Sequence, residues 1–398
     1  MHSSTTRGVF IVAVAAGIAA GSTRSFLTPR AQQSNESRSF GPGVCGPADP
    51  AYLRITNETG GQPFFMSPAE IGKSALVMAT SASDEGLILW ASGTIADRGR
   101  GFTIPVDPSI SQLSLSATFD GTGGTFSVIG PDGVTVKAGA RTQETVLNCG
   151  RVLTIEAPAA GAWRLQVSPT SRFWLIARGR SDLDLLSAEF VRLGGRPGHE
   201  GLFKIPGQPV AGQAATLRVQ IAEPQPDPPA FVLMSLRGQP IRRVRLTPVD
   251  DEEFDGPIDH LPSEPFRVSI VGVDRSGASY QRMHAGLFHA ENVELRPAGD
   301  PQTLPPGEET AVSFVVRNAG PRARYRIVAV DANQFVARVE PDSVDLEPRA
   351  EQIVRVVLRV PAGAPAGTGV ELTITATSDG PRQTSNSAVQ RFTVAGGR

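Results

Sequence analysis

The feature that most constrains the fold of this chain is an alternation of apolar and polar residues with a period of two. From about Leu87 onward, short segments such as residues 102–106 (FTIPV), 113–117 (LSLSA) and 125–129 (TFSVI) alternate in this way. Such alternation puts every second side chain on the same face of a β-strand. Turns separate the segments at intervals of about ten residues, which is typical of a β-sandwich.

The glycine and proline content agrees with many short strands. The chain has 42 glycines and 33 prolines among 398 residues, and they are dispersed as turns. Gly130-Pro-Asp-Gly133 is the clearest turn, because proline fixes φ at the first corner and glycine accepts a positive φ after it. We therefore predict a mainly β fold with three tandem β-sandwich domains, immunoglobulin-like or jelly-roll-like. They span residues 87–185, 186–289 and 290–398.

Residues 49–86 form the one segment where the sequence predicts a helix. Residues 52–55 (YLRI) are strand-like, and residues 67–70 (SPAE) offer an N-cap serine, a proline at the first helical position and a capping-box glutamate. The apolar residues that follow at helical spacing are Ile71, Ala75 and Met78. One strand and one helix cannot enclose a core, so we expect this segment to dock on the strands that follow.

The N-terminus predicts export. Arg7 precedes an apolar or small run from Val9 to Gly21, which is too short to span a bilayer and fits a signal peptide over residues 1–21. An uncleaved anchor is the alternative. Residues 22–48 are polar enough for a flexible linker, and no later stretch is apolar enough to cross a membrane. We expect a secreted, periplasmic or cell-surface protein, and the scarcity of lysine beside arginine hints at a bacterial source.

The chain has two cysteines, Cys45 and Cys149. An even number of cysteines at an oxidising destination favours one disulfide between them. Two buried thiols or a redox-active pair are the alternatives, although the sequence has no Cys-x-x-Cys motif.

Motifs for catalysis are missing from the sequence. It has no Gly-x-Ser-x-Gly, and no His-Glu-x-x-His pattern surrounds the four later histidines, His199, His260, His284 and His289. Residues 121–124 (GTGG) precede a β-alternating segment instead of a helix, so we interpret them as a hairpin turn and not a phosphate loop. We predict no catalytic, cofactor-binding or metal-binding residues; a hydrolase site assembled from distant residues is the alternative.

The charge pattern argues against nucleic-acid binding. The formal net charge is −1, so the overall balance does not favour phosphate backbones or anionic membrane surfaces. The sharpest local feature is the acidic run Asp250–Asp255 (DDEEFD). Its carboxylates could hold calcium, but we favour a solvated loop that faces Arg242, Arg243 and Arg245 across a hairpin.

Several blocks together resemble a known group of proteins. Residues 57–64 followed by a short helix resemble the last strand and helix of a von Willebrand factor A domain. Further blocks occur in the order seen downstream of that domain, namely residues 102–107, 130–133, 161–164, 181–184, 207–212 and 265–272. The set is similar to von Willebrand factor A domain-containing protein 7 and to the amino-terminal region of hemicentins. An intact A domain would carry an Asp-x-Ser-x-Ser metal motif, which is absent before Tyr52, so the resemblance transfers no metal ligands.

These observations lead to one functional hypothesis and one alternative. We expect an exported, non-catalytic structural or interaction protein of the adhesion type, which binds an extracellular or envelope protein or a glycan. The alternative is a carbohydrate-binding or enzyme-accessory module, which would display an exposed row of aromatic side chains. Since Trp90, Trp163 and Trp174 are the only tryptophans, burial of all three would argue against that alternative.

Overall fold

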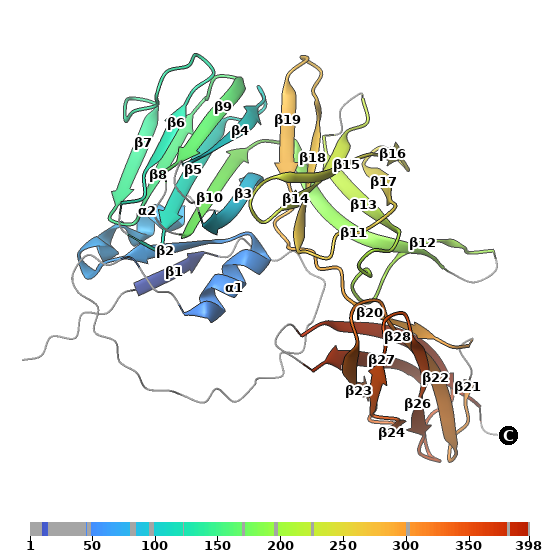
Figure 1. Ribbon diagram of the computed structural model, residues 1–398. Coiled ribbons are helices and arrows are strands. Elements are labelled where there is room, and N and C mark those ends of the chain that lie inside the picture. Colours follow the sequence, from blue (N-terminus) through green and yellow to red (C-terminus); the bar gives the residue numbers. More distant parts are fainter. Residues whose placement is uncertain are drawn as a thin grey trace, which may run out of the picture. The chain divides into compact units, whose positions relative to one another are not determined.

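The structure is a computed structural model. It describes residues 49–79, 85–94, 99–121, 123–168, 172–194, 198–223, 227–299, 303–379 and 383–396, together with Cys45 and the backbone of residues 10–14. The rest of the predicted signal peptide and linker lies outside the described residues. The mainly β fold predicted from the sequence is confirmed, with short helices only between residues 50 and 79 of the described chain (Figure 1).

The chain divides into two compact units. Unit 1 comprises residues 1–188, 219–256 and 266–288, and unit 2 comprises residues 189–218, 257–265 and 289–398. The domain boundaries predicted at residues 185 and 289 stay a prediction.

Unit 1 contains a nine-stranded sheet in which every neighbouring pair is antiparallel. Its order is β15 (Pro240–Arg245), β14 (Ala230–Ser235), β18 (Phe266–Val273), β19 (Ser279–Met283), β3 (Gly86–Thr94), β10 (Arg172–Arg180), β5 (Gln112–Phe119), β8 (Gly150–Glu156) and β7 (Thr142–Leu147). Strands β19 and β3 meet at one residue pair, Met283 with Leu87.

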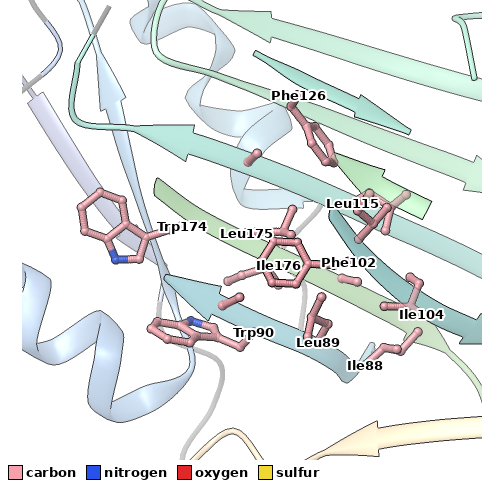
Figure 2. Close-up of a cluster of buried hydrophobic side chains, with 14 of the residues drawn as sticks. Ile88, Leu89, Trp90, Phe102, Ile104, Leu115, Phe126, Trp174, Leu175 and Ile176 are labelled. Carbon is pink, nitrogen blue, oxygen red and sulfur yellow. The ribbon is translucent and has the colours of Figure 1, made fainter. Parts of the chain in front are cut away.

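A three-stranded sheet supplies the second layer of the first sandwich. Its order is β4 (Arg100–Val106), β9 (Gly161–Val167) and β6 (Phe126–Ile129). Trp163, Leu165 and Val167 share the buried face of β9, as the alternation predicts. Figure 2 shows side chains from both layers meeting in one core, among them Phe102 of β4 and Leu175 of β10.

The prediction of a hairpin at residues 121–124 is wrong. The strand before this segment, β5, lies in the nine-stranded sheet, and the strand after it, β6, lies in the three-stranded sheet. The glycines therefore turn the chain from one layer of the sandwich to the other. The turn at residues 130–133 is confirmed, since the Gly133 N–H donates to the Gly130 carbonyl at 3.0 Å and Gly133 has φ of 81°.

The strand predicted at residues 52–55 is also wrong, because these residues lie in helix α1 (Pro50–Thr59). The helix is fixed at both ends. The Asp49 carboxylate accepts from the Ala51 N–H at 2.8 Å, and Gly60 ends the helix in the left-handed conformation. These caps outweigh the weak strand propensity of the four residues between them.

Strand β2 (Gln62–Met66) follows α1 and precedes a 3-10 helix (Pro68–Lys73) and helix α2 (Ser74–Ala79). The capping box of Ser67 and Glu70 is confirmed. The predicted apolar face is not the buried one, since Ile71 and Met78 are about half exposed and Val77 is fully buried. The 3-10 geometry of the first turns, with three residues per turn, shifts the phase that a regular α-helix would give.

Strand β1 (Phe10–Val14) pairs antiparallel with β2, with Val12 opposite Phe64. These five residues lie inside the predicted signal peptide.

A five-stranded sheet contains strands that contribute residues to both units. Its order is β12 (Gly201–Lys204), β11 (Asp184–Gly194), β13 (Ala215–Ala222), β17 (Glu253–Ile258) and β16 (Thr247–Pro248).

Unit 2 contains a sandwich built from the last third of the chain. One sheet has the order β20 (Val293–Pro297), β22 (Glu309–Asn318), β26 (Glu351–Arg359) and β24 (Val336–Glu340). The other has the order β21 (Thr303–Leu304), β28 (Ser385–Val394), β27 (Gly369–Ser378), β23 (Ala323–Asp331) and β25 (Ser343–Leu346). Apolar residues of both sheets form one core, in which the Tyr325 hydroxyl donates to the Asn318 side-chain oxygen at 2.9 Å.

A segment from earlier in the chain is fixed to this sandwich within unit 2. The buried Asn386 side chain donates to the Gln208 carbonyl at 2.9 Å and accepts from the Gln208 N–H at 2.8 Å. The Ala211 N–H donates to the Glu291 carbonyl at 3.0 Å. Residues 207–212 therefore pack on this sandwich, although its first strand, β20, begins only at Val293.

Across the described residues, the structure has no helix that is long and apolar enough to cross a membrane.

Candidate functional site

The residues that the sequence singled out for chemistry do not converge on one place in the structure. The described parts of the chain hold no group of three or more His, Cys, Asp or Glu side chains placed to bind a metal. His284 accepts a hydrogen bond from the Gly286 N–H at 3.1 Å, and its ring lies 5.4 Å from the ring of Phe288. This histidine therefore orders a turn.

The acidic run Asp250–Asp255 folds as a capped turn that leads into β17. The Asp250 carboxylate accepts from the N–H groups of Glu252 at 2.9 Å and Glu253 at 2.7 Å. The predicted hairpin with the arginines is wrong, because the arginine strand β15 pairs with β14, and β17 pairs with β16. The run serves as the connection between two strands.

The two cysteines are joined in a disulfide, with 5.6 Å between their Cα atoms. Both residues are buried, at 3% exposure for Cys45 and 6% for Cys149. Cys149 lies between β7 and β8, so the bond ties the chain just before α1 to the first sandwich.

A group of buried polar side chains holds the segment from α1 to β2 against the strands of unit 1. The indole N–H of Trp90 donates to the Gly61 carbonyl at 3.0 Å, and the Thr118 hydroxyl donates to the Pro63 carbonyl at 2.8 Å. The guanidinium of Arg178 donates to the Gly60 carbonyl at 3.2 Å. Carbonyls at the end of the helix and the start of the strand thus find partners away from water.

Arg267 of β18 is the most unusual member of this group, because it is fully buried and its guanidinium donates to backbone carbonyls in the described structure. It donates to the backbone carbonyls of Ala285 and Asn57, and its guanidinium carbon lies 4.4 Å from the ring centre of Trp90. Burial lowers the pKa of Arg267 to about 9. Its Nε has no hydrogen-bond partner in the described structure. The ring face, the two carbonyls and the charge of Glu58 stabilise this cation, whereas the charge of Arg178 opposes it.

Gly60 makes this close packing possible. Its φ is 68°, and a Cβ atom at this position would lie 2.7 Å from the Ala285 carbonyl oxygen. The same carbonyl accepts from Arg267. The end of α1 and the segment after β19 therefore fit only with glycine at residue 60.

A second buried cation, Arg282 of β19, forms a complete ion pair. Its Nη1 donates to Asp107 Oδ2 at 2.8 Å, and both side chains are fully buried. Arg282 also donates to the Leu183 carbonyl at 2.7 Å and the Ser181 hydroxyl at 2.9 Å. Burial raises the pKa of Asp107, but the hydrogen bonds and charge of Arg282 and the hydrogen bonds of Ser109 outweigh burial and hold this pKa below its usual value.

Asp184, beside the same cations, shows the opposite effect. Burial raises the pKa of Asp184 against the hydrogen bond from the Leu185 N–H and the charges of Arg282 and Arg178. The Asp184 carboxylate also packs against Gly86, where an added Cβ atom would lie only 2.6 Å from Asp184 Oδ1. The start of β3 and the start of β11 are therefore packed tightly together.

Chemically, this buried cluster is suited to holding segments together. The Ser109 hydroxyl donates to Asp107, and the Asp107 carboxylate forms an ion pair with Arg282, so the three side chains join the segments that carry them. The cluster stabilises the fold of unit 1, and no motif in the sequence predicts it.

All three tryptophans are buried, at 0% exposure for Trp90, 4% for Trp163 and 1% for Trp174. Each indole N–H donates to a protein oxygen, in two cases a backbone carbonyl. An exposed tryptophan platform for sugars is therefore absent.

Comparisons with known proteins agree with this architecture. Residues 92–182 match the hemicentin galactose-binding domain-like family, and residues 293–396 match the VWA7 Ig-like domain family. The chain resembles the β-rich region downstream of the A domain in these proteins. The first match covers the first sandwich of unit 1, and the second covers the sandwich of unit 2.

Individual relatives cover the chain more widely. It is 26% identical over 294 residues to von Willebrand factor A domain-containing protein 7 of Rattus norvegicus, covering 68% of this chain and 32% of that protein. It is 21% identical over 250 residues to Hemicentin-1 of Mus musculus, covering 60% of this chain and 4% of that protein. The chain therefore corresponds to about a third of one relative and a small part of the other.

Among solved structures, the ASH/PapD-like domain 7 of human CEP192 aligns with 27% of this chain and 88% of that domain at 15% identity, with a TM-score of 0.23.

Proposed function

We propose that this protein is an exported, non-catalytic adhesion-type module that presents β-sandwich surfaces to an extracellular or envelope partner. The matches to an Ig-like and a hemicentin domain family carry the proposal, because domains of these kinds support an adhesion or interaction role for both sandwiches. The disulfide between Cys45 and Cys149 supports an oxidising destination. The apolar run from Val9 to Gly21 supports export by a signal peptide.

The interior chemistry supports a non-catalytic role. Asp107 and Arg282 neutralise each other in a fully buried pair. Arg267 is fixed between a ring face and two carbonyls. Groups held in this manner favour a rigid scaffold, and a scaffold acts through its surface. The burial of all three tryptophans favours a protein partner over a glycan partner.

Export can be tested with a matched pair of chains. The full chain with a C-terminal tag is expected outside the cytoplasm, shortened near Ala20 or Gly21. The Ala13→Arg variant, which places a charge in the middle of the apolar run, is expected to stay inside and keep its full length. Retention of both chains in the cytoplasm would contradict the proposal.

The interaction role can be tested on the exported protein. Immobilised protein is exposed to purified extracellular-matrix and envelope proteins and to a glycan array. Saturable binding to a protein that survives removal of glycans is the expected result. Binding to sugars alone would replace the protein partner with a glycan partner.

A further inference from the structure

We infer that the outer edge of β2 is a binding site for an extended apolar strand of another polypeptide chain. This inference rests on the proposed function, since it requires that export removes residues 1–21. In the structure this edge is occupied by β1, which lies inside the removed segment. Loss of β1 leaves β2 without a paired strand in the described part of the chain, because β1 and β2 form a two-stranded sheet there.

The two edges of β2 differ in their hydrogen-bonding groups. The carbonyls of Gly61 and Pro63 point into unit 1, where they accept from Trp90 at 3.0 Å and Thr118 at 2.8 Å. The N–H and C=O of one residue in a strand lie on the same edge. The missing N–H of Pro63 therefore falls on the inner edge, where none of the described strands pairs with β2.

The outer edge of β2, which pairs with β1, keeps all of its backbone hydrogen-bond donors. Alternation along the strand puts the N–H and C=O groups of Gln62, Phe64 and Met66 on the side of β1, and Phe64 lies opposite Val12 in the register. A sheet tolerates proline in a strand where the missing N–H faces away from the paired strand. The sequence of β2 thus preserves every donor on the edge that receives a strand.

The faces of β2 leave only this edge for a partner. Phe64 and Met66 pack into a cluster with Val77, and Phe65 packs on the opposite face, with its ring 5.6 Å from that of Trp174. With β1 in place, all five residues of β2 are buried. The disulfide and the contacts of Trp90 and Thr118 hold the strand in place before a partner arrives, which reduces the entropy cost of binding.

The strand seated on this edge indicates the chemistry of the partner. Residues 10–14 read FIVAV, which is apolar and rich in β-branched residues, without proline or charge. Such segments favour the extended conformation, and main-chain hydrogen bonds then give affinity by adding a strand. We therefore assign the site to an extended apolar segment of about five residues in another polypeptide, paired antiparallel with β2.

A peptide assay tests this site directly. A fluorescent peptide with the sequence of residues 9–15, flanked by lysines, is titrated into two proteins. These are the exported protein that lacks residues 1–21 and the full chain made without export. Binding is expected with the exported protein, and at least tenfold weaker binding with the full chain, whose β1 already fills the edge.

Two modified peptides provide the matched control. N-methylation at Val12 removes a donor that faces β2, whereas N-methylation at Ala13, opposite Pro63, removes a donor that faces away. The Val12 peptide is expected to bind at least tenfold more weakly than the Ala13 peptide. Equal binding of the two would overturn the inference, since it would show apolar adsorption without strand pairing.

Other outcomes would assign the edge to a different occupant. If the exported protein is a dimer that the peptide does not dissociate, a second copy occupies the edge and the inference is wrong. Absence of binding to either protein also contradicts it. Because a directly expressed chain of residues 22–398 can be titrated in the same way, failure of export alone would not be confused with failure of the edge to bind.

Discussion

Replacement of Arg282 by methionine should destabilise unit 1 strongly. The guanidinium of Arg282 makes hydrogen bonds to Asp107 at 2.8 Å, to the Leu183 carbonyl at 2.7 Å and to the Ser181 hydroxyl at 2.9 Å. Methionine retains much of the side-chain volume but provides no donor. The variant therefore leaves a buried carboxylate at Asp107 whose remaining hydrogen-bond donors, among the described residues, belong to Ser109.

The expected cost follows from the burial of the pair. Both side chains have no exposed surface, so solvent cannot replace the lost partner. Removing one member of such a pair costs about 3–5 kcal/mol. At about 2–4 °C per kcal/mol for a domain of this size, the melting temperature of unit 1 should fall by about 6–20 °C.

The assay uses the tryptophans as reporters. All three lie in unit 1 and are buried, so their fluorescence during urea unfolding follows that unit. Lys73→Met is the control, because Lys73 is an exposed cation in unit 1 whose amine donates to the Val146 carbonyl. Loss of this exposed hydrogen bond should lower the free energy of unfolding by about 0–1 kcal/mol. The double variant Asp107→Leu with Arg282→Met should recover most of the stability. A loss below about 1 kcal/mol for Arg282→Met would refute the buried pair.

Three further outcomes test other parts of the structure. Burial raises the pKa of Tyr280 and Tyr325 to about 12, so both tyrosines contribute stability that is present below pH ~10 and lost as the pH rises through about 12. Phenolate absorbance should show that two of the three tyrosines ionise only as the pH approaches about 12. Ionisation of all three near pH ~10 would contradict this burial. Gly207→Ala should destabilise unit 2 by about 1–3 kcal/mol, because the added methyl group would collide with Asn386 and the Ser387 carbonyl. Hydrogen exchange of the β28 amides measures the effect. Unchanged protection of these amides would show that residues 207–212 are not fixed to β28. Cys149→Ser should destabilise unit 1 by up to about 4–5 kcal/mol, since the disulfide with Cys45 closes a loop across a sequence separation of 104. A urea unfolding midpoint that stays unchanged under non-reducing conditions would argue against this disulfide.

The sandwich strands could be predicted because their pattern is local. In β9, Trp163, Leu165 and Val167 alternate with exposed residues, and the structure buries them together. The Gly130–Gly133 turn and the capping box at Ser67 are likewise set by neighbouring residues.

The buried arginines could not be predicted, because their burial depends on distant segments. In β18, Phe266, Val268 and Ile270 form an apolar face, which assigns Arg267 and Ser269 to the solvent face. The end of α1 and the segment after β19 cover that second face and supply the carbonyls that Arg267 needs. An arginine at this position in a strand does not indicate that other segments of the chain will bury it.

Helix α1 was missed for a related reason. The four residues from Tyr52 to Ile55 favour a strand when taken alone, whereas Asp49 and Gly60 determine the helix from outside that window. The docking of this segment was anticipated, since a strand and a helix cannot enclose a core, but the polar groups that hold it were not.

The most direct test of the central claim is mass spectrometry of protein recovered from outside the cytoplasm and digested without reduction. An exported interaction module held together by its disulfide should begin after Ala20 or Gly21 and yield one linked peptide pair containing Cys45 and Cys149. Recovery of the protein only from the cytoplasm, with Met1 retained and both thiols free, would contradict the account.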